Sequence, residues 1–286
     1  MNPVCILTDS TAQFTKPLFP GNDLVRIAPL MVSLNLPIEP AENGNQWKVS
    51  SLPASARKGL EPRLIPPSTE EFVELFLHLG QIYSEIVAIF LSSSLSQTVA
   101  NARQASEAVR GQVNVQVIDS QTTSIGLGVL VETAAGAAAA GASVADIECL
   151  VRGAIPHIYT VFSIPGLTYL QQAGLLDAGQ ALVGEMLGLY PLYTMEEGRL
   201  TPLEKVRNLR HLQDYFQEFV DEFDDLSHIA FIQCSPSLGH EAHALREHAG
   251  DCFPETSFSE HPISLWLATL LGPRTVGVFA IEKPEA

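Results

Sequence analysis

The run Ile86-Val-Ala-Ile-Phe-Leu91 leads directly into Ser92-Ser-Ser-Leu-Ser-Gln-Thr98, and this junction carries the clearest structural signal in the chain. Six consecutive apolar residues are typical of a short strand that is buried on both faces of a sheet. The amphipathic pattern that follows, with Ala105 and Val109 on its apolar side, predicts a helix. A buried strand that passes through hydroxyl residues into a helix indicates one βα unit of a parallel sheet.

The same alternation surrounds this junction. Residues 4–8 and 113–118 are strand-like, and they end in Asp9-Ser10-Thr11 and Asp119-Ser120. Three further helices are predicted between and after these strands, at residues 69–79, 125–142 and 144–155. Ser68 or Thr69 would cap the first of them, and Ser143 would cap the last. We therefore predict a Rossmann-like α/β domain with a parallel sheet over residues 1–157.

The second half of the chain has a different pattern, which predicts an α+β domain over residues 158–286. A hairpin is indicated by Leu187 to Thr194 and the turn Glu196-Glu-Gly-Arg199, and a long helix is expected over residues 203–223. Further strands are predicted at residues 158–162, 229–234 and 276–281, with a helix at residues 238–249.

Composition limits the classes of function. The chain has 286 residues, 46% of them hydrophobic, and 32 acidic against 16 basic residues give a formal net charge of −16. This charge repels phosphate backbones and anionic lipid, so neither nucleic acid nor a membrane surface is an expected partner. Asp9 interrupts the apolar N-terminus and Glu132 interrupts the apolar run 125–142, so we expect a cytoplasmic protein, without membrane insertion and monomeric.

The three polar strand ends predict where a ligand binds. The carboxyl ends of parallel strands share one edge of the sheet, where helices begin and their free N–H groups favour an anion. Ser92, Ser93, Ser94 and Ser96 would add hydroxyl donors for a carboxylate. Ordinary helix capping is the alternative reading of these serines.

Other chemistries have weaker support. There is no GxxxxGK[ST] motif, and Gly126-Leu-Gly128 is only a fragment of a dinucleotide fingerprint, better explained by helix packing, so no cofactor is expected. His240, His243 and His248 lack metal-ligand spacing, as do the four cysteines, so no metal site is predicted. A serine hydrolase that uses Ser93 or Ser94 stays open as an alternative, although no GxSxG elbow is present.

The order of motifs resembles the DegV family of bacterial fatty-acid-binding proteins over nearly the whole chain. The stretch Leu91 to Thr98 is similar to the family signature SSxLSGT, with Gln97 in place of the usual Gly. Further stretches match family landmarks in order: Ile6-Leu-Thr-Asp-Ser-Thr11, Ile27-Ala-Pro-Leu30, Val117-Ile-Asp-Ser120, Leu167-Thr-Tyr-Leu170, Gly198-Arg-Leu-Thr-Pro202, Lys205-Val-Arg207 and Gly272-Pro273.

The resemblance implies a lipid-binding protein that is not itself an enzyme. A long-chain fatty acid would be buried between the two domains, with its carboxylate held by Ser93 and Ser96. A separate fatty acid kinase subunit would act on that carboxylate for phospholipid metabolism, near Arg207. A regulatory or interaction subunit on the same scaffold, without lipid, is the alternative.

Several positions depart from the family pattern. Alignment on Pro67-Ser68 places Leu64 and Ile65 where the family has a carboxylate-binding Thr and its neighbour. Leu270 replaces a His, and Leu175 replaces an Arg. The candidates to replace the lost donors are Ser10, Ser68, Thr69 and Arg274.

Overall fold

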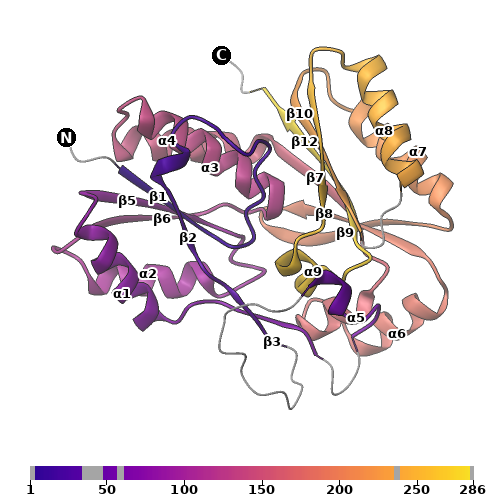
Figure 1. The fold of residues 1–286 in the computed structure, drawn as a ribbon. Coiled ribbons are helices and arrows are strands. Elements are labelled where there is room, and N and C mark those ends of the chain that lie inside the picture. Colours follow the sequence, from indigo (N-terminus) through magenta and orange to yellow (C-terminus); the bar gives the residue numbers. More distant parts are fainter. Residues whose placement is uncertain (1–3, 34–47, 57–60, 235–238, 284–286) are drawn as a thin grey trace. The chain divides into compact units, whose positions relative to one another are not determined.

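The computed structural model describes residues 4–33, 48–56, 61–234 and 239–283 (Figure 1). The chain divides into two compact units. Unit 1 comprises residues 1–31 and 65–157, and unit 2 comprises residues 32–64 and 158–286. Each unit has a sheet and a hydrophobic core of its own.

Unit 1 is built on a four-stranded parallel sheet with the strand order β2-β1-β5-β6. Its strands are β1 (Val4–Asp9), β2 (Val25–Ala28), β5 (Glu85–Phe90) and β6 (Asn114–Asp119). β1 pairs with β2 on one side and with β5 on the other, in parallel register in both cases. The order of strands therefore reverses between β1 and β5, which is the switch point where open α/β sheets bind ligands.

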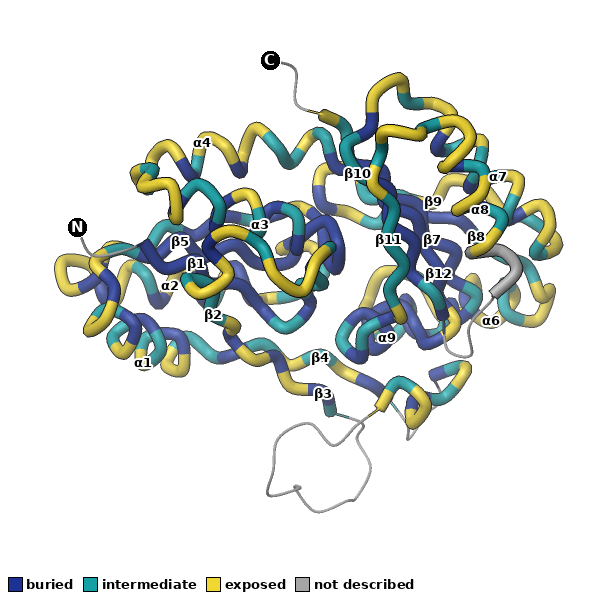
Figure 2. Tube along the Cα trace, turned by 45° about the horizontal axis from the view of Figure 1, so that its top comes forward, coloured by how far each residue is buried: buried dark blue, intermediate teal, exposed yellow. Residues whose placement is uncertain are grey.

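Helices cover both faces of this sheet (Figures 1 and 2). They are α1 (Thr69–Gly80), α2 (Thr98–Ala108), α3 (Ser124–Ala139) and α4 (Val144–Ala154). α1 and α2 pack against one face, where Phe72, Phe76 and Phe90 are fully buried, and α3 and α4 contact the other face. The predicted parallel α/β architecture is thus present, including the caps at Ser68 and Ser143.

Unit 2 is built on a six-stranded mixed sheet with the order β11-β10-β12-β7-β8-β9. Its strands are β7 (Ile158–Ser163), β8 (Tyr190–Glu196), β9 (Arg199–Val206), β10 (Leu226–Gln233), β11 (Ser257–Pro262) and β12 (Val276–Glu282). Its helices are α5 (Leu167–Gln172), α6 (Ala178–Met186), α7 (Leu209–Asp221), α8 (Gly239–Cys252) and α9 (Leu265–Leu271). α7 and α8 pack on one face of the sheet around Phe216, Leu245 and Phe231.

Shorter elements complete the description. The strands β3 (Met31–Ser33) and β4 (Arg63–Ile65) pair with each other, and single 3-10 turns occur at Asn22–Leu24, Val49–Ser51 and Ile155–His157. None of the helices in the described ranges is both long enough and apolar enough to cross a bilayer.

The sequence predicts an irregular excursion at residues 37–63 and includes it in the domain over residues 1–157. Residues 32–64 group with unit 2. Tyr169 donates a hydrogen bond of 2.5 Å from its hydroxyl to the carbonyl of Pro53, and Ala56 N–H donates to Thr168 Oγ1 at 2.9 Å. These contacts are with residues more than 100 positions away, so no local pattern predicts them.

Two secondary-structure predictions were wrong in part. Residues 203–206 belong to β9 rather than to the long helix, and α7 begins only at Leu209, where the side chain of Asn208 caps it by accepting from His211 N–H at 2.9 Å. The sequence also predicts one extended run over residues 24–36, but within its described part, residues 24–33, β2 ends at Ala28 directly before Pro29 and β3 begins at Met31. β11, α5, α6 and α9 were not predicted.

Candidate functional site

Asp9 joins the ends of the two strands at the switch point. Its side chain is fully buried, and it accepts hydrogen bonds from Leu91 N–H at 2.8 Å, Thr11 N–H at 2.8 Å and the Thr11 hydroxyl at 2.5 Å. Burial raises the pKa of the Asp9 carboxyl above its ordinary value, and these three hydrogen bonds oppose that rise. Asp9 therefore fixes the position of Leu91, the residue that leads into the serines.

A second carboxylate holds the serines from the opposite strand. Asp119, at the end of β6, accepts from Ser93 N–H at 3.2 Å and from Gln121 N–H at 3.0 Å. Ser92 N–H donates to the carbonyl of Thr122 at 2.8 Å. The segment 92–97, which we term the serine loop, is thus anchored through its backbone to the neighbouring strand end.

The hydroxyls of the serine loop differ in their exposure. Ser92 is buried, and its hydroxyl shares a hydrogen bond of 3.1 Å with that of Ser94. Ser96 is half-buried, and its hydroxyl lies 2.8 Å from that of Thr98. Ser93 and Ser94 are exposed. Because the backbone is anchored, the loop presents these two hydroxyls to solvent in a defined position.

The serine loop leads into a helix whose start has little side-chain capping. The N-cap residue of α2, Gln97, makes no side-chain capping bond within the described residues, and Thr98 N–H donates to Ser96 Oγ at 3.3 Å. α1 differs, since Ser68 accepts from Glu71 N–H at 3.2 Å while Glu71 accepts from Ser68 N–H at 2.7 Å. The positive end of α2 is therefore the better placed of the two to receive an anion.

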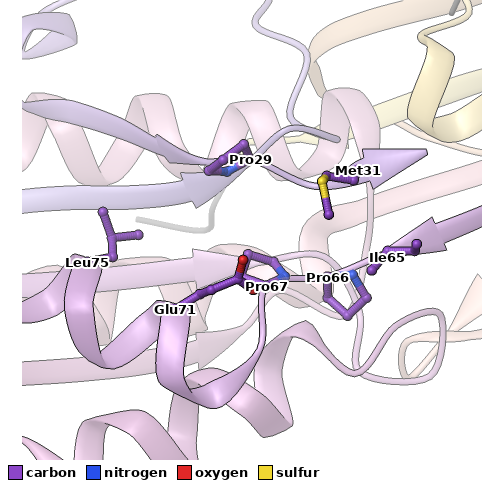
Figure 3. Close-up of a pocket in the computed structure, with 7 residues that line it drawn as sticks. All are labelled: Pro29, Met31, Ile65, Pro66, Pro67, Glu71 and Leu75. Atoms are coloured by element: carbon purple, nitrogen blue, oxygen red, sulfur yellow. The ribbon is translucent and has the colours of Figure 1, made fainter. Parts of the chain in front are cut away.

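An apolar pocket lies in the same unit (Figure 3). It is formed by residues after β2, by the end of β4 and by the start of α1: Pro29, Met31, Ile65, Pro66, Pro67, Glu71 and Leu75. Met31 and Ile65 are 56% and 41% exposed, so their apolar surface is open to solvent. The pocket has a volume of about 210 Å³.

Hydrogen bonds connect the pocket wall to α2. Asn101, in the first turn of α2, donates from its side chain to the carbonyl of Pro67 at 2.8 Å, and Thr69 donates its hydroxyl proton to Gln104 at 3.1 Å. The helix that begins at the serine loop is thus bonded to the segment that lines the pocket. The serine loop with its polar donors and the apolar wall of the pocket are therefore both attached to α2.

The remaining predicted site residues fall in different places. Ser10, after β1, accepts from Leu30 N–H at 3.0 Å, and Ser68 caps α1 as described above. Ile65 lines the pocket. Leu64, Arg207 and Arg274 belong to unit 2, where Leu64 is half-buried in β4 and the two arginines are exposed after β9 and α9. Unit 1 thus contains the serine loop, Ser10, Ser68 and Ile65.

Sequence reasoning did not identify the residues that hold the site in place. Asp119 was recognised as part of a polar strand end, but its bond to Ser93 N–H depends on the pairing of β5 with β6. No sequence pattern marked Asn101 as part of the site. The pair Pro66-Pro67 before a helix cap was the one available sign of a rigid apolar wall.

The site can bind an anion with an apolar tail. The groups at the serine loop are hydroxyls and backbone N–H groups, which donate hydrogen bonds to a carboxylate. An N–H group cannot coordinate a metal ion, and uncharged hydroxyls alone bind one weakly. The carboxylates of Asp9 and Asp119 are occupied by protein N–H and hydroxyl donors.

Comparison with known proteins identifies the same family by a family model and by individual relatives. The model of the DegV family of uncharacterised proteins matches residues 3–283. A DegV domain-containing protein of Caldanaerobacter subterraneus subsp. tengcongensis is 29% identical over 289 residues, which cover 99% of this chain and 100% of the relative.

Two solved structures share the fold. A DegV family protein from Thermus thermophilus, described for its fatty acid binding, has a TM-score of 0.80 and 24% identity, over 98% of this chain and 100% of its own. A fatty acid binding DegV family protein from Streptococcus agalactiae has a TM-score of 0.82 and 22% identity, over 98% and 99% of the two chains. These likenesses confirm the predicted fold class.

Proposed function

The chain belongs to the DegV family, as its sequence motifs predicted, and from this premise we propose that it binds a long-chain fatty acid whose carboxylate lies at the serine loop. The observation that carries the proposal is the anchored serine loop at the start of α2, in the same unit as an apolar pocket. The fatty acid binding of the Thermus thermophilus and Streptococcus agalactiae relatives supports it.

The carboxylate would be held by hydrogen bonds rather than by an ion pair. The candidate donors from unit 1 are the hydroxyls of Ser93, Ser94 and Ser96 and the first N–H groups of α2, with the Ser94 and Ser96 hydroxyls exchanging their present bonds to Ser92 and Thr98 for bonds to the ligand. A hydrogen bond to a charged group contributes about 1.5–3 kcal/mol. Such local donors have to outweigh the repulsion that a net charge of −16 exerts on any anion.

The apolar pocket would take part of the acyl chain. Its volume of about 210 Å³ is below the ~300–1,000 Å³ of a typical small-molecule site, so it holds a portion of the chain only. Each methylene removed from water contributes about 0.8 kcal/mol. The aliphatic side chain of Ile65 is part of this apolar wall.

We further propose that the protein is a carrier in the cytoplasm and that a separate fatty acid kinase subunit performs the chemistry. The exposure of Ser93 and Ser94 supports this, because a carboxylate at these hydroxyls stays open to a partner. The kinase would transfer a phosphoryl group from ATP to a carboxylate oxygen, giving an acyl phosphate and ADP. Arg207, exposed after β9, is a candidate contact for that partner.

Lipid analysis tests the proposal directly. We expect organic extraction of the purified protein, followed by mass spectrometry, to yield about one fatty acid per chain, and the stripped protein to bind palmitate or oleate. Absence of lipid in the extract, together with no binding of either acid, would overturn the proposal.

Substitutions then locate the head group. We expect Ser93→Ala and Ser96→Ala each to weaken binding by roughly tenfold or more, the loss of about one charge-assisted hydrogen bond. Ser106→Ala, near the far end of the same helix α2, is the matched control and should bind like wild type. The thermal stability of lipid-free Ser93→Ala should stay close to that of wild type. If affinity is unaltered in both site variants, the carboxylate lies elsewhere.

A further inference from the structure

Unit 2 brings three metal-ligand side chains together on its helical face, far in sequence from the serine loop. The side chains of Asp221, His248 and Cys252 each offer a ligand atom, and these atoms lie within 4.8 Å of one another. His248 Nε2 is 2.7 Å from Asp221 Oδ1. The three side chains range from exposed to half-buried, so an ion has access to them from solvent.

The convergence follows from how α7 and α8 pack. Asp221 is the last residue of α7 and Cys252 is the last residue of α8, so both helices end at this place. His248 and Cys252 are four residues apart and therefore share one face of α8. The backbone at these positions is anchored, because Val220 and Ala249, the neighbours of Asp221 and His248, are buried in the core of unit 2. Figure 1 shows α7 and α8 side by side.

The electrostatics of the place favour a cation. The carbonyl ends of two helices carry partial negative charge, and here both contribute. The chain following α7 adds Glu222 and Asp224, and Asp251 precedes Cys252, whereas Asp225 is paired with Lys283 at 2.6 Å. Such a concentration of negative charge attracts a divalent ion.

The identity of the ligands selects the kind of cation. Calcium and magnesium prefer sets made entirely of oxygen, whereas imidazole and thiolate favour zinc. Zinc–ligand bonds of about 2.0–2.3 Å imply that tetrahedral ligand atoms lie roughly 3.3–3.8 Å apart. The separation of 2.7 Å between His248 and Asp221 is shorter than this and none of the three exceeds 4.8 Å, so side-chain rotations that open the first and shorten any longer ones would bring the atoms to tetrahedral spacing.

We propose that Asp221, His248 and Cys252 form a site for Zn²⁺ that links the ends of α7 and α8, with water as a fourth ligand. On binding, the Cys252 thiol releases its proton to solvent and the thiolate coordinates the ion. His248 exchanges its hydrogen bond with Asp221 for a bond to the metal. The spacing of His240, His243 and His248 did not predict this site, because two of its ligands are not histidines and one lies on another helix.

The test uses the full chain without an affinity tag, reduced and freed of metal by a chelator. We expect calorimetric titration with Zn²⁺ to give one ion per chain. Cys252→Ser and His248→Ala should each lower the affinity at least tenfold, since even outer partners of a zinc ligand contribute about 10–100-fold. Cys149→Ser and His243→Ala, which remove another exposed cysteine and another histidine of α8, are the matched controls.

Cobalt provides a second readout that a purely structural effect does not change. We expect Co²⁺ to give a thiolate charge-transfer band in wild type and in Cys149→Ser, and no such band in Cys252→Ser. The near-ultraviolet circular dichroism of each variant shows whether its fold is retained. Equal Zn²⁺ affinity in wild type, Cys252→Ser and His248→Ala, or a Co²⁺ spectrum without a thiolate band, would overturn the proposal.

Discussion

Asp9 is a single buried carboxyl that organises the backbone at the proposed head-group site. It accepts hydrogen bonds from Leu91 N–H and from both donors of Thr11, so β1 and the segment that leads into the serine loop are held by one side chain. Burying an ionised carboxylate is costly, and the raised pKa of Asp9 reflects that cost. Burial of Asp9 thus lowers the stability of the folded state at the place where this residue positions the serine loop.

The raised pKa of Asp9 predicts how stability changes with pH. A folded-state pKa above the unfolded value means that the folded protein takes up this proton first as the pH falls. Asp9 therefore lowers the free energy of unfolding as the pH rises from near the unfolded pKa through the folded one, by about 1.4 kcal/mol for each pKa unit of difference. Asp9→Asn removes this titration.

Urea unfolding of wild type and Asp9→Asn over about pH 4 to 7 measures the effect. The variant also changes the acceptors for Leu91 and Thr11, but that difference does not vary with pH. The free energy of unfolding of wild type, relative to the variant, should decline as the pH rises. A difference that is constant or that grows with pH would contradict the assignment.

At the level of elements, small residues decide how closely α3 packs. A side chain at Gly128 would place its Cβ 2.0 Å from the carbonyl oxygen of Gln13, whereas a Cβ at Gly136, later in the same helix, meets nothing within 4 Å. Ser124 also donates its hydroxyl proton to the Gln13 side chain at 2.7 Å. The close approach at Gly128 agrees with the helix-packing interpretation of Gly126-Leu-Gly128.

Gly128→Ala and Gly136→Ala should therefore change stability in opposite directions. Gly128→Ala forces the backbone near Gln13 to move, and we expect a loss of about 1–3 kcal/mol in the free energy of unfolding. Gly136→Ala adds only helix propensity and should gain up to about 1 kcal/mol. Chemical denaturation of both variants measures this. Equal effects of the two substitutions would mean that propensity alone determines the outcome.

The elements of unit 1 were predictable because their signals are local. Buried apolar runs, hydroxyl strand ends and the caps Ser68 and Ser143 each act within a few residues, and the structure has them as expected. The helix expected over residues 203–223 failed at its start because β9 is an edge strand whose residues are mostly exposed. Such a strand lacks the apolar alternation that identifies one.

At the scale of the whole molecule, the information that sequence reasoning lacked is long-range. Grouping residues 48–56 with unit 2 depends on bonds such as that from Tyr169 to Pro53, 116 residues apart. The hydrogen bond from Ser93 N–H to Asp119 and the meeting of Asp221 with His248 likewise depend on which elements pair. The order of family motifs predicted the fold, whereas the pairing of strands and helices determines the details of the two proposed sites.

The two proposals assign separate ligands to separate units, and amide hydrogen exchange can distinguish them in one experiment. Palmitate added to stripped protein should slow exchange in residues 91–101 and 65–75, which contain the serine loop, the start of α2 and the pocket wall. Zn²⁺ added alone should instead slow exchange at the ends of α7 and α8, around Asp221 and Cys252. A ligand at 100 times its Kd stabilises the state that it binds by about 2.7 kcal/mol, which is enough to slow local opening roughly 100-fold.

Ser93→Ala should reduce only the protection by palmitate, and Cys252→Ser should reduce only the protection by Zn²⁺. Palmitate protection confined to residues outside unit 1 would place the fatty acid away from the serine loop, and uniform slowing by either ligand would contradict a local site.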